Sequence, residues 1–74
     1  MRRDPVTSSA IASVGYDETT QTLEIEFVSG RVYRFLEVPP SLAQALRAAP
    51  SHGGFFNLFV RNGGYPYQHV APEE

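Results

Sequence analysis

Residues 22–38 read TLEIEFVSGRVYRFLEV, and this stretch decides the fold. Its first half alternates Leu, Ile and Phe with Glu. Because successive side chains of a strand point to opposite faces, this alternation predicts a strand with one apolar face and one wet face. A second run of the same kind follows Gly30, so the stretch predicts an antiparallel hairpin of strands 22–28 and 31–38.

Two registers fit this hairpin, and the side chains choose between them. A two-residue loop places Ile25 opposite Arg34, which mixes charge into the apolar face. A three-residue loop places Ile25 opposite Tyr33 and Glu24 opposite Arg34, which keeps both faces uniform and adds a cross-strand ion pair. We predict the second register, with Gly30 in the left-handed region that a G1 bulge requires.

Upstream of the hairpin, the chain supplies one further strand. Residues 10–16 alternate apolar and small side chains, and the polar turn 17–21 connects them to the hairpin. Residues 1–9 are polar, contain a proline and show no periodicity, so we predict a flexible arm there. The predicted sheet is therefore a three-stranded antiparallel meander.

Downstream of the hairpin, prolines separate two short predicted helices. Residues 41–49 are strong helix formers that follow two prolines and precede Pro50. Ser51 is a suitable N-cap for a second helix over 55–61, which the glycines after Asn62 terminate. The apolar faces expected to pack inward are Leu42, Ala45, Leu46 and Ala49 in the first helix, and Phe55, Leu58 and Phe59 in the second, with Phe56 and Val60 beside them.

The C-terminal part is expected to be extended over residues 65–70, lying along either the sheet or the helices, with a disordered tail at 71–74. The predicted fold class is therefore α+β: a three-stranded antiparallel β-meander followed by two short helices and an extended C-terminal segment. We place one domain at residues 10–70.

Composition narrows the function classes. The chain has 74 residues with 42% hydrophobic content, including five Phe and four Tyr, which suits one small globular domain. It has no Cys, which excludes disulfides, thiolate metal sites and cysteine nucleophiles and favours a reducing compartment. No apolar run resembles a signal peptide or a membrane span, so we expect a cytoplasmic protein. The net charge of −2 lacks the basic excess of a dedicated nucleic-acid binder.

An ordered set of short motifs then carries a family resemblance. The set comprises Gly15-Tyr16-Asp17, the two strands of the hairpin, Ala49-Pro50-Ser51-His52-Gly53, Phe55-Phe56-Asn57, Val60-Arg61 and Tyr65. In this order, over residues 7–65, the chain resembles the KTSC domain, which is named for the C-terminus of some lysyl-tRNA synthetases and also occurs as a small bacterial protein. The family's central Tyr-x-Tyr is Tyr33-Arg34-Phe35 here, so the second hydroxyl is missing. The resemblance implies a function that is not established, for which RNA binding has been suggested.

Two residues of the hairpin are candidate RNA contacts. Tyr33 and Phe35 lie two apart, like the stacking aromatics of proteins that bind single-stranded RNA, although their position opposite Leu23 and Ile25 favours a place in the core. Arg34 and the other arginines can bind phosphate, but glutamates on the same strands reduce their field.

A second group of candidates surrounds the second helix: Ser51, Asn57, Arg61 and Tyr65. Asn57 and Arg61 are four residues apart and share one side of a helix, so with Tyr65 they form a polar pocket or satisfy loop backbone groups. His52 and His69 are the only histidines and lie far apart in the sequence, so we expect no metal site, no cofactor and no catalytic residue.

The leading hypothesis is a non-enzymatic binding module whose partner is RNA or a protein. One alternative is a small enzyme or ligand-binding domain that uses the polar cluster at the second helix. Another is a homo-oligomer that covers an open sheet edge or apolar face. We expect a monomer or a weak homo-oligomer.

Overall fold

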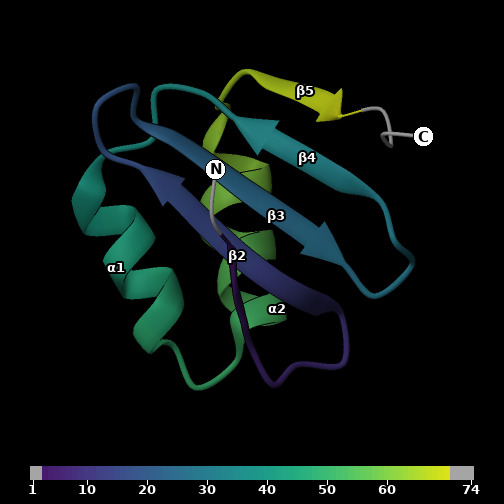
Figure 1. Cartoon of the computed structure of the whole chain (residues 1–74). Coiled ribbons are helices and arrows are strands. Elements are labelled where there is room, and N and C mark those ends of the chain that lie inside the picture. Colours follow the sequence, from purple (N-terminus) through teal and green to yellow (C-terminus); the bar gives the residue numbers. More distant parts are fainter. Residues whose placement is uncertain (1–2, 71–74) are drawn as a thin grey trace.

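The computed structural model describes residues 3–70 and has two layers, a sheet and a helical layer on one of its faces (Figure 1). The five strands are antiparallel and lie in sequence order. They are β1 (Arg3–Pro5), β2 (Ile11–Asp17), β3 (Thr22–Phe27), β4 (Val32–Phe35) and β5 (Tyr67–Val70). The helical layer consists of α1 (Pro40–Ala48), α2 (His52–Phe55), the π-helix η1 (Phe56–Val60) and the 3₁₀-helix η2 (Arg61–Gly63).

The predicted hairpin is confirmed. Strands β3 and β4 pair Glu24 with Arg34 and Ile25 with Tyr33, as the three-residue loop requires. Gly30 has φ +93°, in the left-handed region. The hairpin closes with hydrogen bonds from Phe27 N to the Arg31 oxygen and from Gly30 N to the Phe27 oxygen, both 2.9 Å. Side-chain alternation on both strands and one glycine therefore determine the register.

The prediction of three strands is wrong in number, because the sheet has two further edge strands. Strand β1 lies inside the predicted N-terminal arm and pairs Arg3 with Gly15. Strand β5 lies inside the predicted extended segment and pairs Tyr33 with His69. Both edge strands, of three and four residues, are too short to show a periodicity of their own. They form because they pair with β2 and β4, which the sequence pattern around them does not reveal. The predicted tail, 71–74, lies outside the described residues.

The core fills the space between the sheet and the helical layer. Its buried hydrophobic residues come from β2, β3, β4, the segment after β4, α1 and η1: Ile11, Val14, Leu23, Ile25, Phe35, Val38, Ala43, Leu46, Phe56 and Val60. Phe27 is partly buried at the edge of this cluster. The apolar faces of the hairpin strands thus point inward as predicted.

The first helix is close to its prediction. It covers Pro40–Ala48 rather than 41–49, with a proline at its first turn as expected. Leu46 is fully buried and Leu42 packs against the core, but Ala43 takes the buried position that the prediction gave to Ala45.

The second helix differs more from its prediction. Ser51 is its N-cap, as predicted, and its Oγ accepts a hydrogen bond of 3.1 Å from Gly54 N. The helix already begins at His52, and from Phe56 it widens to a π-helix, in which the Arg61 N–H bonds the Phe56 oxygen. The i→i+5 spacing rotates the later side chains relative to an α-helix. In the structure Phe56 and Val60 are buried, whereas Leu58 and Phe59, which were predicted to face the core, are 67% and 52% exposed.

The outer face of the sheet carries charged side chains, but not all of them are exposed to solvent. Glu24, predicted on the solvent face, is only 4% exposed. The Arg3 side chain reaches across Gly15, which has no side chain, so that its Nη1 lies 3.4 Å from Glu24 Oε2. Arg34 approaches from the other side, with Nε 2.9 Å from Glu24 Oε1. Two arginines therefore cover and neutralise this carboxylate, and one of them attaches β1 to the sheet.

Tyr16 connects the sheet to the segment that enters α1. Its hydroxyl donates to the Val38 carbonyl oxygen. Partial burial raises the pKa of Tyr16, and the negative charges of Glu18 and Asp17 raise it further. The folded protein therefore holds this proton more tightly than the unfolded chain does.

A dependence of stability on alkaline pH follows from Tyr16. The free energy of unfolding should keep its full Tyr16 contribution below the ordinary tyrosine pKa of about 10 and lose it as pH rises through the raised folded pKa. Urea unfolding across this range measures the loss. Tyr16→Phe should give a flatter alkaline profile, and an equally steep loss in that variant would contradict the assignment.

Candidate functional site

A groove opens between the helical layer and the strands β4 and β5. Its volume is about 610 Å³, which lies within the range of small-molecule and cofactor sites. We call it the aromatic groove, because six of its lining residues are Phe27, Tyr33, Phe35, Phe56, Tyr65 and Tyr67. The other lining residues are Asn57, Arg61, Asn62 and Gly64.

Contacts between rings fix the floor of the groove. Period-two alternation on β4 places Tyr33 and Phe35 on the face that meets the helical layer. The Phe35 and Phe56 rings meet edge to face with centroids 5.3 Å apart. Tyr67, on the neighbouring strand β5, has its ring centroid 6.1 Å from that of Tyr33. These packed rings form a preorganised surface, and Tyr67 is 65% exposed on it.

Tyr65 borders the groove from the turn after η2, and glycine positions it. A Cβ atom on Gly63 would lie 2.6 Å from Cε2 of Tyr65, which is closer than real side chains approach. The absence of a side chain at Gly63 therefore lets the Tyr65 ring pack directly on the backbone. Gly64 follows with φ +77°, the left-handed conformation that ends the helix and turns the chain toward β5.

The polar side chains of the groove have no hydrogen-bond or ion-pair partner among residues 3–70. The hydroxyls of Tyr33, Tyr65 and Tyr67 and the side chains of Asn57 and Arg61 make no hydrogen bond or ion pair among residues 3–70. By contrast, the arginines outside the groove at positions 3, 34 and 47 are each paired with a carboxylate. The groove thus presents free donors, free acceptors and one free guanidinium above an apolar floor.

A second, smaller hollow adjoins the groove at Asn57. Its volume is about 400 Å³, and we call it the hydroxyl hollow because Thr7, Ser8, Ser9 and Ser51 line it. The Ser8 Oγ atom accepts hydrogen bonds from Ala10 N and Ile11 N, both 3.2 Å, and so holds the start of β2. Asn57 is the residue that lines both hollows.

The structure separates the predicted site residues into three places. Four of them, Tyr33, Asn57, Arg61 and Tyr65, line the aromatic groove together. Ser51 caps α2 and borders the hydroxyl hollow instead. Arg34 lies on the opposite face of the sheet, paired with Glu24. Whether any of these residues binds a ligand stays a prediction.

Tyr67 and Asn62 also line the groove and were not among the predicted site residues. The spacing of Tyr65 and Tyr67 was visible in the sequence, but the pairing of β5 with β4, which brings Tyr67 against Tyr33, was not. Asn62 appeared only as part of the turn that ends the helix.

Charge and composition further limit the chemistry of the groove. No Asp or Glu is among the described residues that line the groove or the hollow. Within residues 3–70, no three or more His, Asp or Glu side chains gather as a metal site would require. In the same range, no helix has the length and apolar character needed to cross a membrane.

Comparisons with known proteins match nearly the whole chain. The family model described as KTSC domain matches residues 7–65. A protein of Stutzerimonas stutzeri is 43% identical over 70 residues, which cover 95% of this chain and 99% of that protein. The crystal structure of a KTSC domain protein from Yersinia pestis has a TM-score of 0.88 and 37% identity, and the match covers 95% of this chain and 97% of that chain.

A second kind of relative is much longer. Lysine–tRNA ligases of Nostoc punctiforme and Trichormus variabilis are 43% and 40% identical to the chain over 63 residues. The match covers 85% of this chain but only 11% of each ligase. Domains similar to this chain therefore occur both as small proteins and as a minor part of a larger enzyme.

Proposed function

The chain belongs to the KTSC domain family, and from this membership and its groove we propose a non-enzymatic module that binds unpaired RNA. One observation carries the proposal: three tyrosines, Asn57 and Arg61 converge on one groove, and among residues 3–70 no carboxylate lines it and no side chain or backbone group pairs with their polar groups. Such groups bind and orient a ligand. The lack of cysteine leads us to place this module in the cytoplasm.

The chemistry of the groove matches that of an unpaired nucleotide. Bases stack on aromatic side chains, and each such contact contributes about 1–3 kcal/mol. The Arg61 guanidinium suits a phosphate, to which it can donate two parallel hydrogen bonds. The Asn57 amide is both donor and acceptor and can pair with the edge of a base. The tyrosine hydroxyls suit the ribose 2′-hydroxyl, which distinguishes RNA from DNA.

The charge distribution favours a single strand over a duplex. Duplex RNA is recognised by its backbone across a wide surface, because its bases are stacked on one another. The arginines on the broad outer face of the sheet, Arg3 and Arg34, are already neutralised by Glu24. Among the described residues, the groove offers rings and a single unpaired cation, Arg61, which suits exposed bases rather than a helical backbone.

The ligase relatives support RNA as the polymer. An enzyme named lysine–tRNA ligase acts on tRNA, and a domain similar to this chain forms part of it. A small module that holds unpaired RNA would be useful in that setting and as a separate protein.

Substitution of Arg61 tests the proposal. A single-stranded hexanucleotide should quench tyrosine fluorescence, because three of the four tyrosines line the groove and the chain has no Trp. Arg61→Gln should weaken binding about tenfold, the effect of losing one charge-assisted hydrogen bond. It should also reduce the slope of log affinity against log salt by about 0.7.

Arg31→Gln is the matched control, because Arg31 is exposed in the β3–β4 loop and does not line the groove. It removes the same charge and should change the affinity by less than about twofold. Equal losses in the two variants, or equal affinity for a duplex of the same length, would overturn the proposal.

A further inference from the structure

We propose that the aromatic groove is one end of a longer track that continues past Asn57 into the hydroxyl hollow, and that the ligand is therefore a linear RNA segment rather than a single nucleotide. This inference rests on the proposed function and specifies its ligand. In this arrangement, bases occupy the aromatic groove and the sugar–phosphate backbone follows the second helix into the hollow.

The first support is proximity. Asn57 lines both the groove and the hollow, so the two lie next to each other along the helix, with this one exposed side chain at their boundary. From Arg61 at one end to Ser51 at the other, the helical segment extends about 15 Å at 1.5 Å per residue. A stacked single strand rises about 3.4 Å per nucleotide, so a chain of about four nucleotides spans this length.

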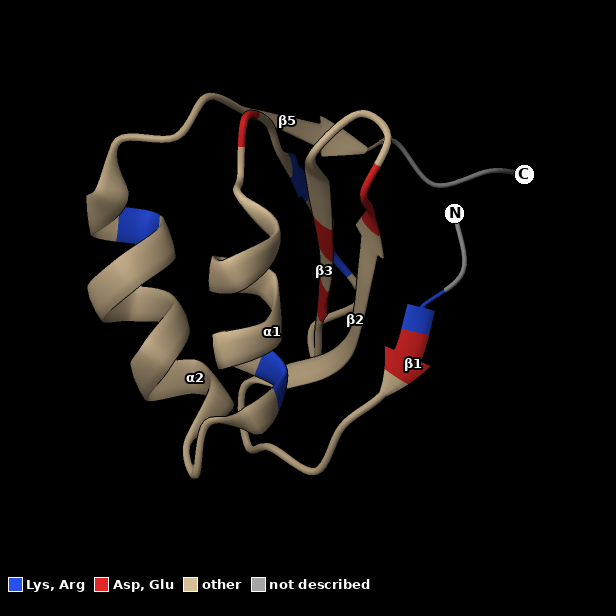
Figure 2. Ribbon diagram, turned by 90° about the vertical axis from the view of Figure 1, so that its left-hand side faces the viewer, with Lys and Arg blue, Asp and Glu red and all other residues tan. Residues whose placement is uncertain are grey.

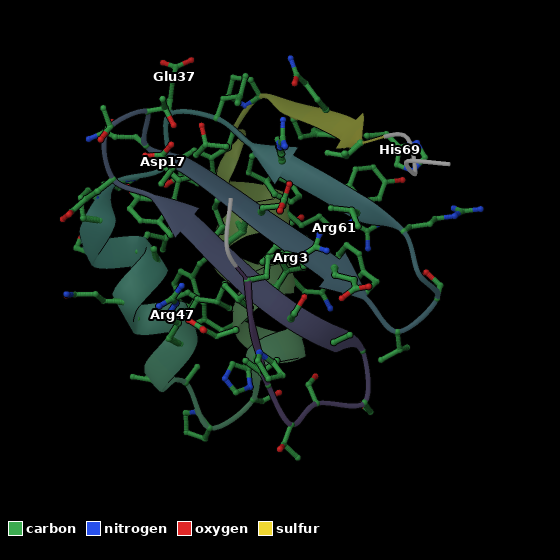
Figure 3. All side chains as sticks on the ribbon, in the orientation of Figure 1. Arg3, Asp17, Glu37, Arg47, Arg61 and His69 are labelled. Atoms are coloured by element: carbon green, nitrogen blue, oxygen red, sulfur yellow. The ribbon has the colours of Figure 1, made fainter. Side chains whose placement is uncertain are left out.

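The second support is the exclusion of negative charge from the track. The chain has eight acidic residues and a net charge of −2, yet no acidic side chain lines either hollow among the described residues. Figure 2 shows acidic segments on the sheet and on the turn before α1, and none on the second helical segment. Figure 3 places Asp17 and Glu37 at the opposite end of the sheet from His69. A polyanion therefore meets least repulsion along this helix.

The third support is the set of donors in the hollow. Thr7 and Ser9 are exposed, and their hydroxyls have no hydrogen-bond partner in residues 3–70. The Ser8 and Ser51 oxygens accept backbone N–H groups, which leaves the proton of each hydroxyl free to donate. Hydroxyl donors are common partners of phosphate and sugar oxygens and carry no base specificity. The hollow thus suits the backbone, as the groove suits bases.

The test compares ligand lengths on the whole chain. Adenosine monophosphate, a diadenylate and a hexaadenylate RNA are titrated into the protein, with hexadeoxyadenylate as the DNA arm. If the track exists, the hexanucleotide binds about tenfold or more tightly than the dinucleotide, because only the longer ligand reaches the hollow. Ser9→Asp places a carboxylate in the hollow and should weaken hexanucleotide binding about fivefold while leaving dinucleotide binding unchanged.

Ser41→Asp is the matched control, since it adds the same charge at an exposed position on α1 and should leave both affinities unchanged. Thr7→Glu provides a second carboxylate in the hollow if Ser9→Asp does not fold. A hexanucleotide that binds no better than the dinucleotide, or that is insensitive to the carboxylate, overturns the track but leaves the proposed function intact. Absence of binding by every RNA overturns the proposed function itself.

Discussion

Replacing Leu46 with alanine is expected to lower the free energy of unfolding by about 3 kcal/mol, because the side chain is fully buried between α1 and the sheet. The loss combines the transfer of the removed methyl and methylene groups with the cavity left behind. In a domain of this size it corresponds to a midpoint of thermal unfolding lower by about 12–24 °C. Chemical and thermal unfolding followed by circular dichroism measure both quantities.

Leu58→Ala makes the identical chemical change on the second helical segment and serves as its control. Leu58 is 67% exposed, so the free energy of unfolding should change by less than about 0.5 kcal/mol. The pair also tests the orientation of the second helical segment, because the orientation predicted from the sequence would bury Leu58. A large loss in Leu58→Ala would show that the helix is rotated relative to this structure.

Replacing Glu24 with glutamine is expected to cost about 2 kcal/mol. The substitution keeps the shape of the side chain but removes the charge that Arg3 and Arg34 surround, and hydrogen bonds to charged groups contribute about 1.5–3 kcal/mol. The arginine side chains are 29% and 43% exposed, so water compensates part of the loss. Urea unfolding measures the cost, and hydrogen exchange of the β1 amides should accelerate, since Arg3 loses its partner.

Glu37→Gln is the control for this charge, because Glu37 is exposed on the turn before α1. Its substitution should change stability by less than about 0.5 kcal/mol. If both variants lose the same stability, general electrostatics rather than the Arg3–Glu24–Arg34 cluster would be responsible.

The central hairpin, its register and the caps of the helices are predictable from the sequence because local rules determine them. Alternation in residues 22–38 determines which side chains face the core and which face solvent. Of the two possible registers, one would place the charged Arg34 on the apolar face, and the structure has the other. Gly30, Ser51 and Gly64 occupy positions whose backbone geometry or hydrogen bonds require those residue types.

The edge strands and the π-helix are not predictable in the same way. Strand β1 has three residues, including a proline, and is held by Arg3 reaching Glu24 across a glycine, which is a tertiary contact. The π-helix differs from an α-helix in its backbone hydrogen bonds, and the weak helix formers in its sequence FNLFV do not by themselves distinguish one from the other. Tertiary packing decides both features.

The candidate site was predictable in part for the same reason. Asn57 and Arg61 lie near each other on one helix, and Tyr65 follows shortly after, so sequence spacing groups them. Tyr33 joins them only because β4 packs under the helical layer, and Tyr67 only because β5 pairs with β4. Arg34 was predicted as a site residue because arginine can bind phosphate. Its side chain is instead paired with Glu24, which the predicted register had already placed opposite it.

Strand β5 has a consequence for how the site opens. Strands β1 to β3 are each connected to the next strand of the sheet by a short loop. Strand β5 pairs with β4, but all the helices lie between them in the sequence. A terminal strand joined in this way is the first unit expected to detach in a sub-global opening, at a smaller free energy than complete unfolding. Tyr67 leaves with it, so the wall of the groove exists only while this strand is docked. A ligand that binds against Tyr67 would accordingly stabilise the docked form of β5 and lower the rate at which its amides exchange.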